Sequence, residues 1–253
     1  MNQILVTEKL YITPELKRKK KIYKFYFILS VFIVLILTSF YIYAEYDRNK
    51  SAEVSQQLLD DMNKTLEGTT EDTTIAQDDV LLVVLNGTTE ETKQEEQQSS
   101  VTTANEKAEW KTSAAGYKYK IIATVEVPKI SLKYTVVQGQ SGSIEETESL
   151  LKSSPVKYHG YDPNEVGNFC IVGHNYRNSK FFSKVPNLTV GDTVKLTDLT
   201  GRTINYEVYD KHTVDPSDTK DTTQLTGGRK ELTLITCTDD SKLRVIVRCK
   251  EVK

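Results

Sequence analysis

The sequence contains little cysteine, glycine or proline: 3 Cys, 12 Gly and 6 Pro in 253 residues. So few cysteines exclude a scaffold held together by many disulfides, and so little glycine and proline excludes a collagen-like chain. An excess of charge is also missing, because 33 Lys+Arg face 35 Asp+Glu and give a net charge of −2. This balance argues against a protein built around a basic surface that binds nucleic acid.

One long apolar run is present. Residues 25–44 carry no charged side chain, and a helix of this length spans about 30 Å, the thickness of the hydrocarbon core of a bilayer. Basic residues crowd the stretch just before it, at positions 17–21 and 24. The positive-inside rule therefore predicts a cytoplasmic basic tail (1–24), a transmembrane helix (25–44) and an extracellular remainder. A cleaved signal peptide is the alternative, but the run exceeds the roughly 7–15 residues usual for its apolar region.

The next segment, residues 45–113, is rich in Thr, Glu and Gln and nearly free of aromatic residues. Such a composition buries too little apolar area to offset the entropy of ordering, and it predicts an acidic, mostly flexible extracellular stalk. Residues 45–66 have weak helical character that could extend the membrane helix. The short apolar run 80–85 reads either as a marginal strand or as a segment that covers an active-site groove.

From residue 114 to 253 the sequence consists of short runs of β-branched and aromatic residues separated by turn signals, which predicts a mainly β domain, a barrel or a sandwich. Short helices are expected at 145–152 and 179–184. About 140 residues are enough for one hydrophobic core.

Among the cysteines, Cys237 stands out because it ends an apolar strand (231–237) and opens a polar turn, where a reactive side chain can be presented on a rigid scaffold. Cys170 and Cys249 lie inside apolar strands and are interpreted as small core residues or as a disulfide pair.

A hairpin formed by strands 231–237 and 243–250 would set Arg244 directly across the ladder from Cys237. A guanidinium there would stabilise a thiolate and a developing oxyanion. Arg248 lies on the same face but about 13 Å further along, at 3.3 Å per residue, and is the weaker candidate. An exposed arginine without a role in the site is the other interpretation.

Of the three histidines, His174 follows a strand and enters a polar loop, where an imidazole can act as a general acid or base. His159 and His212 are interpreted as a turn residue and a strand-face residue.

Metal chemistry has little support in the sequence. The absence of CxxC and HxxxH spacings argues against zinc, and no Walker or Rossmann glycine pattern occurs. Acidic residues gather at 145–148 and 162–165 and could bind calcium, although no EF-hand loop is present. We therefore expect no cofactor, with calcium as a weakly supported exception.

Taken together, these motifs resemble the sortases, membrane-anchored cysteine transpeptidases of Gram-positive bacteria. Residues 233–237 (TLITC) resemble the TLxTC signature of the family, and residues 172–175 (VGHN) its histidine motif. Arg244 resembles the downstream arginine. Further matches are VPKI (127–130), VVQG (136–139) and FFSKVPNLTVGDTV (181–194).

The resemblance implies an eight-stranded sortase-type β-barrel in which Cys237, His174 and Arg244 meet in one groove. It also implies cleavage of an LPxTG-like sorting signal and transfer of the acyl group to an amine of a peptidoglycan precursor or of a pilin. The short loop between the strands ending near 214 and starting near 231 favours a class A-like or D-like enzyme over class B. Two alternatives remain open: a papain-like peptidase that cleaves peptidoglycan, and a noncatalytic surface-binding domain.

Overall fold

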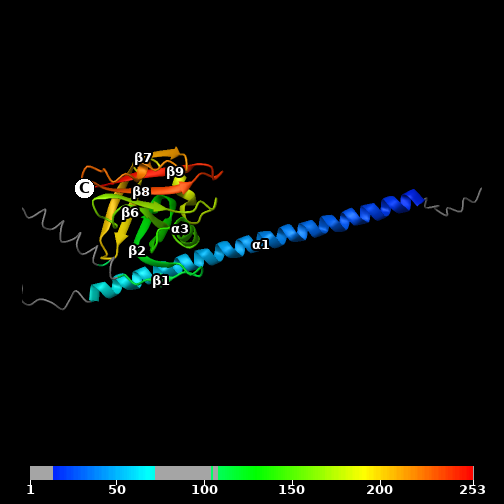
Figure 1. Cartoon of the computed structure of the whole chain (residues 1–253), viewed down its shortest axis with the longest axis horizontal. Helices are drawn as coiled ribbons and strands as arrows, with labels where there is room; N and C mark the ends of the chain where they lie inside the picture. Colours follow the sequence, from blue (N-terminus) through cyan, green and yellow to red (C-terminus); the bar gives the residue numbers. More distant parts are fainter. Residues whose placement is uncertain (1–13, 72–103, 105–107, 253) are drawn as a thin grey trace, which may run out of the picture. The chain divides into compact units, whose positions relative to one another are not determined.

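The computed structural model describes residues 14–71, 104 and 108–252. Its elements in chain order are α1 (Pro14–Glu71), β1 (Lys111–Thr112), β2 (Lys118–Val127), the 3-10 helix η2 (Pro128–Ile130), β3 (Leu132–Gly139), α3 (Ile144–Leu150), β4 (Val156–His159), β5 (Gly167–Val172), the 3-10 helix η3 (Phe182–Asn187), β6 (Thr193–Asp198), β7 (Thr203–Val214), the 3-10 helix η4 (Lys220–Thr222), β8 (Lys230–Cys237) and β9 (Arg244–Glu251) (Figure 1). The chain divides into two compact units, residues 1–50 and 51–253. The predicted segment 80–85 lies outside the described residues.

The first unit contains the apolar part of α1. Within the described residues, this is the one helix that is long and apolar enough to cross a membrane, and no residue in its most apolar stretch is buried. The side chains of Phe27, Phe32 and Phe40 are each at least 60% exposed, as expected for a surface that lipid would cover.

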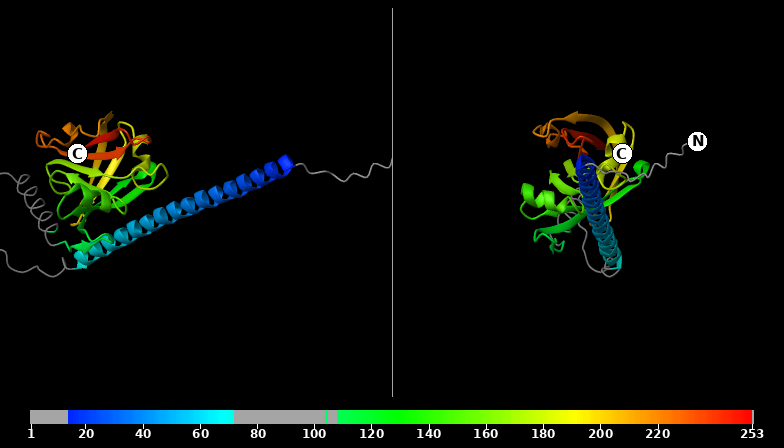
Figure 2. Two further views of the ribbon diagram at one scale, coloured as in Figure 1. Left: turned by 45° about the vertical axis from the view of Figure 1, so that its right-hand side comes forward. Right: turned by 90° about the vertical axis from the view of Figure 1, so that its right-hand side faces the viewer.

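Within the described residues of the second unit, nine strands form one sheet, and eight of them, β2 to β9, close into a barrel, while the two-residue β1 pairs only with β2. Figure 2 shows the barrel from two further sides. The strand order is β1-β2-β3-β4-β5-β8-β9-β7-β6, and an additional antiparallel pairing between β2 and β6 closes the ring. β2 is ten residues long and pairs with three strands: with β1 at its start, with β3 along most of its length and with β6 over residues 123–126. A register irregularity between Ile121 and Ala123 is a bulge that bends the strand. The predicted eight-stranded, mainly β barrel with few helices is confirmed.

The barrel interior is filled by alternate residues of its strands, as the two-residue period of a strand requires. Strand β8 turns Leu232 and Leu234 inward, and β9 turns Val245, Val247 and Cys249 inward. The intervening residues of both strands therefore face the outside of this wall, and the candidate site is built there.

The C-terminal part of α1 packs on the outside of the barrel. Leu58 and Met62 are 4% and 1% exposed, and they join a cluster with Ile121 of β2 and Leu150 of α3. The spacing of four residues puts both side chains on one helix face, and burying each contributes about 1.5–3 kcal/mol. The sequence predicts residues 51–71 as part of a mostly flexible stalk. In the structure they are helical and belong to the same unit as the barrel.

Candidate active site

Cys237 and Arg244 face each other across the hairpin of β8 and β9. The antiparallel register pairs Cys237 with Arg244, as the hairpin geometry predicted. Both are partly buried, and the hairpin is closed beyond them by a hydrogen bond from the Thr238 amide to the Leu243 carbonyl at 3.0 Å. Arg244 is therefore held beside the cysteine by the ladder itself.

His174 reaches the same edge of the sheet from β5. Strands β5 and β8 are parallel, and their register ends with Val172 opposite Ile235. The Gly173 amide then donates to the Ile235 carbonyl at 3.0 Å. Two further residues on each strand bring His174 level with Cys237, and neighbouring strands lie about 4.8 Å apart. The three predicted residues thus lie at the adjoining ends of β5, β8 and β9.

Gly173 is required where the histidine loop leaves the strand. A Cβ atom at this position would lie 2.4 Å from the ring of Phe182, far inside van der Waals contact. The Thr236 hydroxyl donates to the Gly173 carbonyl at 2.9 Å and is itself 1% exposed. The close approach of the phenylalanine ring therefore explains the glycine before His174.

The electrostatic environment of His174 favours a neutral ring. Burial lowers the pKa of this imidazole below its ordinary value, Glu148 opposes that shift and Lys152 adds to it. The ring of Tyr176 lies 5.0 Å away, centroid to centroid. At neutral pH the ring can therefore accept a proton.

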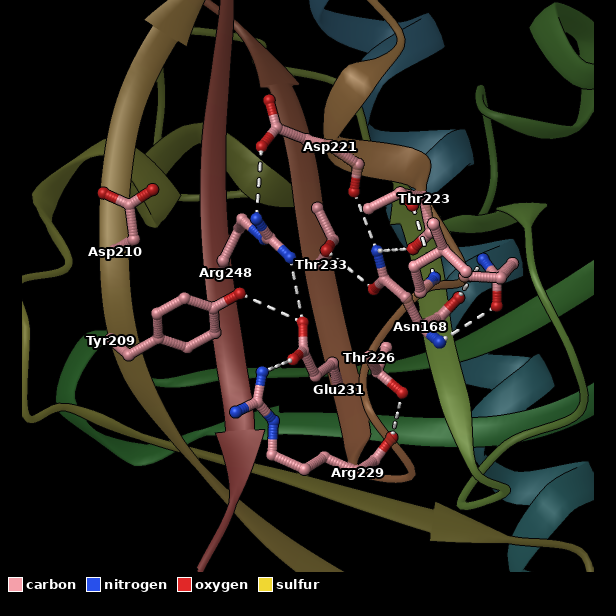
Figure 3. Close-up of polar contacts among 12 residues, drawn as sticks. Asn168, Tyr209, Asp210, Asp221, Thr223, Thr226, Arg229, Glu231, Thr233 and Arg248 are labelled. Atoms are coloured by element: carbon pink, nitrogen blue, oxygen red, sulfur yellow. Dashed lines mark hydrogen bonds and ion pairs between the residues drawn. The ribbon is translucent and has the colours of Figure 1, made fainter.

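Arg248 lies in a network of polar side chains on the barrel wall (Figure 3). Its guanidinium contacts Glu231 at 2.9 Å and Asp221 at 3.7 Å and lies 5.3 Å from the ring centroid of Tyr209. Glu231 is only 2% exposed, so this is a largely buried ion pair that ties two barrel strands together. Arg244 instead donates to the neighbouring carbonyl of Leu243 at 3.3 Å. The structure therefore leaves Arg244, rather than Arg248, available to a substrate.

The other two cysteines are buried and unbridged. Cys170 and Cys249 are both 0% exposed, and all three cysteines are free, so the alternative of a disulfide is not found. Burial raises the pKa of Cys170 to about 12 and raises that of Cys249 as well. Cys170 packs with Ile235 and Ile246 on the outer face, in line with Cys237. These side chains form a small buried apolar cluster on the outer face of the wall, and Val172 and Val214 pack against it.

Asn168 anchors the β7–β8 loop (Figure 3), a role that the sequence pattern did not predict. This asparagine is 0% exposed, and its side chain donates to the carbonyls of Asp221 and Thr223 at 2.7 and 3.3 Å. Its oxygen accepts from the Thr233 hydroxyl at 2.8 Å. The two threonines of the TLITC motif, 233 and 236, are thus both hydrogen-bonded to β5 and its extension. The one sequence signal that could have pointed to Asn168 is a polar residue at the start of an otherwise apolar strand.

The acidic residues considered for calcium have other partners. The Glu146 carboxylate accepts from the amides of Gln140, Ser141 and Gly142, and Asp162 pairs with Lys157 at 3.2 Å. Within the part of the chain that the structure describes, no group of three or more His, Cys, Asp and Glu side chains could hold a metal ion.

A separate pocket of about 520 Å³ lies between the β3–α3 loop, β4 and the β7–β8 loop. Its lining includes Gln138, Thr147, Tyr158 and Gln224 but none of the three residues at the strand ends. The hollow is therefore distinct from the candidate active site.

Comparison with known proteins defines the class. A model of the sortase domain family matches residues 125–252, just over half of the chain. The barrel is therefore that of a transpeptidase. The chain belongs to the sortase family.

Solved structures with similar folds include three sortases. They are the sortase D5 transpeptidase of Clostridium perfringens (25% identity, TM-score 0.49, covering 76% of this chain and 98% of that one), sortase C-1 of Actinomyces oris (20%, 0.47, 76% and 99%) and sortase A of Corynebacterium diphtheriae (21%, 0.47, 83% and 95%). The search of curated proteins finds no match. Nothing in these comparisons favours the papain-like peptidase or the noncatalytic domain. With its candidate membrane-spanning helix, the chain fits a membrane-anchored sortase.

Proposed function

We propose that this sortase uses Cys237 as its nucleophile, His174 as its proton carrier and Arg244 as its oxyanion stabiliser. The substrate is a surface protein with an LPxTG-like sorting signal near its C-terminus. The observation that carries the proposal is the strand register, which pairs Cys237 with Arg244 and brings His174 level with both at one sheet edge.

In the first half of the reaction, Cys237 Sγ attacks the carbonyl carbon of the Thr–Gly bond and its proton passes to the neutral imidazole of His174. Arg244 stabilises the negative oxygen of the tetrahedral intermediate. The C–N bond then breaks, and the imidazolium gives its proton to the leaving amine. A thioester to Cys237 remains.

In the second half, an amine of a peptidoglycan precursor or of a pilin attacks the thioester. His174 takes the proton of the attacking nitrogen and returns it to the departing sulfur, so the enzyme regains its starting state. If water attacks instead, the same steps give hydrolysis, which is the endopeptidase side of the activity. No diffusible cofactor takes part, and we retain a class A-like or D-like assignment as a prediction.

The proposed location follows from charge. The basic residues before α1's apolar run favour an N-terminus in the cytoplasm and a barrel outside the cell. There the enzyme would meet both the sorting signal and the wall or pilin amine.

The test is cleavage of a fluorogenic LPxTG peptide by the full chain in detergent, with Cys237→Ala beside it. We expect cleavage by the wild type and none by the variant, and product joined to an added amine. Cys170→Ala is the matched control, because that thiol is buried and has a raised pKa. Cleavage that survives Cys237→Ala refutes the assignment of the nucleophile.

A further inference from the structure

Asn175, the residue after His174, reaches across to the strand that carries Cys237. Its Nδ2 donates to the backbone carbonyl of Cys237 at 2.9 Å and to Oδ1 of Asp239, also at 2.9 Å. Its own Oδ1 accepts from the Arg177 amide at 2.9 Å. One amide side chain therefore bonds to its own loop and to the residue at the end of β8.

This bond lies where the regular ladder has ended. The last pair of the β5–β8 register is Val172 with Ile235, and strand ends without ladder partners fray. Beyond that pair, Asn175 bonds to the Cys237 carbonyl and Arg177 Nη2 bonds to Ser241 Oγ at 2.9 Å. Side chains thus continue, between the histidine loop and the β8–β9 turn, the connection that the backbone makes further down the strands.

We infer that Asn175 is a positioning residue that holds the Cys237 backbone level with His174. The inference rests on the proposed function of those two residues. Proton transfer from the thiol to the imidazole needs the two groups within hydrogen-bond reach, and a displacement of about 1 Å can cost roughly 100-fold in rate. An amide that bonds both the histidine loop and the cysteine carbonyl fixes that spacing through the backbone and leaves both side chains free to react.

Asn178 offers a matched control in the same loop. Its Oδ1 accepts from the Lys180 amide at 2.8 Å, as Asn175 accepts from the Arg177 amide, and from the Ser183 hydroxyl at 3.4 Å. Both partners lie within five residues of Asn178 in the sequence. Asn178→Ala removes a similar local turn contact and leaves the bond to Cys237 in place.

The experiment compares full-length wild type, Asn175→Ala, Asn175→Asp and Asn178→Ala in detergent. Steady-state cleavage of an LPxTG peptide gives kcat and KM, and alkylation by iodoacetamide across pH gives the midpoint of thiol reactivity. Cys170 and Cys249 are 0% exposed, so alkylation of the folded protein reports Cys237. Near-UV circular dichroism checks the fold of each variant.

For both Asn175 variants we expect a fall in kcat of about 10- to 100-fold, little change in KM and a shifted alkylation midpoint. Asn175→Asp keeps the size and the Oδ1 acceptor but turns a carboxylate toward the Cys237 carbonyl, so it also serves if the alanine variant fails to fold. Asn178→Ala should stay within about threefold of wild type, well below the cost of a misplaced reacting group.

Equal behaviour of Asn175→Ala and Asn178→Ala in kcat and in the alkylation midpoint overturns the inference. If the wild type shows no cleavage that depends on Cys237, the proposed function fails. The alkylation midpoints of the Asn175 variants still decide whether this residue sets the environment of the thiol.

Discussion

Replacing Arg248 by alanine should destabilise the barrel without impairing the chemistry. The guanidinium is 22% exposed and contacts Glu231, which is 2% exposed, at 2.9 Å. Breaking a buried pair costs about 3–5 kcal/mol because the remaining charge is left without compensation. Glu231 keeps two further partners, Arg229 at 2.9 Å and the Tyr209 hydroxyl at 3.0 Å, so the lower end, about 3 kcal/mol, applies. For a protein of this size that corresponds to a fall in Tm of roughly 6–12 °C.

The assay is thermal unfolding followed by circular dichroism, with peptide cleavage measured well below the Tm of the variant. Arg244→Ala is the paired variant: it should lower kcat by two orders of magnitude or more and leave the Tm within about 2 °C, since Arg244 makes no buried ion pair of this kind. The opposite pattern, in which Arg248→Ala abolishes cleavage in a protein with unchanged Tm, would show that the two arginines have been assigned the wrong way round.

Predictions for Gly173, His174 and His212 rest on the immediate surroundings of each residue. Gly173→Ala should lower stability and kcat together, because its new Cβ would lie 2.4 Å from the ring of Phe182; a Tm equal to wild type would contradict this. Burial lowers the pKa of His174, so kcat/KM should fall on the acid side with a midpoint below the ordinary histidine value of about 6.5. A midpoint above that value would contradict a buried neutral ring. Burial acts to lower the pKa of His212 too, but its bonds to Asp221 and Asp210 outweigh that effect and raise it. The stability that His212 contributes is therefore complete below pH 6.5 or so and is lost as pH rises through the higher folded value, and the difference in Tm between wild type and His212→Ala should shrink over that range.

Much of the barrel can be predicted from the sequence because most strands are apolar, or alternate apolar with polar residues, and are bounded by clear turn signals. Strand β4 is the exception: it has four residues, two of them exposed, and its sequence shows no run of buried positions. The expected helix at 179–184 is found as the 3-10 helix η3 at Phe182–Asn187, three residues later, where Pro186 within it is incompatible with a regular α-helix. The helix expected at 145–152 is α3, which begins one residue earlier because Ser143 caps it by accepting from the Glu146 amide at 3.2 Å.

The candidate site could be predicted only in part, for a physical reason. The pairing of Cys237 with Arg244 is local, since a six-residue connection between two strands fixes their register. The Asn168 and Asn175 contacts join residues more than 50 positions apart, and no local pattern encodes them. The docking of Leu58 and Met62 on the barrel is equally non-local, and a segment with few apolar residues therefore reads as a stalk in the sequence.

The position of the site follows from the parallel pairing of β5 with β8, one of two parallel pairs in a mostly antiparallel barrel. In an antiparallel pair the C-terminal end of one strand lies beside the N-terminal end of its neighbour, so the two C-terminal ends lie at opposite edges of the sheet. Strands β5 and β8 run parallel, and residues 173–229 form the long connection that a parallel pair requires. Both strands therefore end at the same rim, one leading to His174 and the other to Cys237, and the antiparallel return of β9 adds the start of a third strand, Arg244. Backbone pairing thus brings three residues from distant positions in the sequence to adjoining strand ends, and beyond the last ladder pair the Asn175 side chain adds a bond to the Cys237 carbonyl.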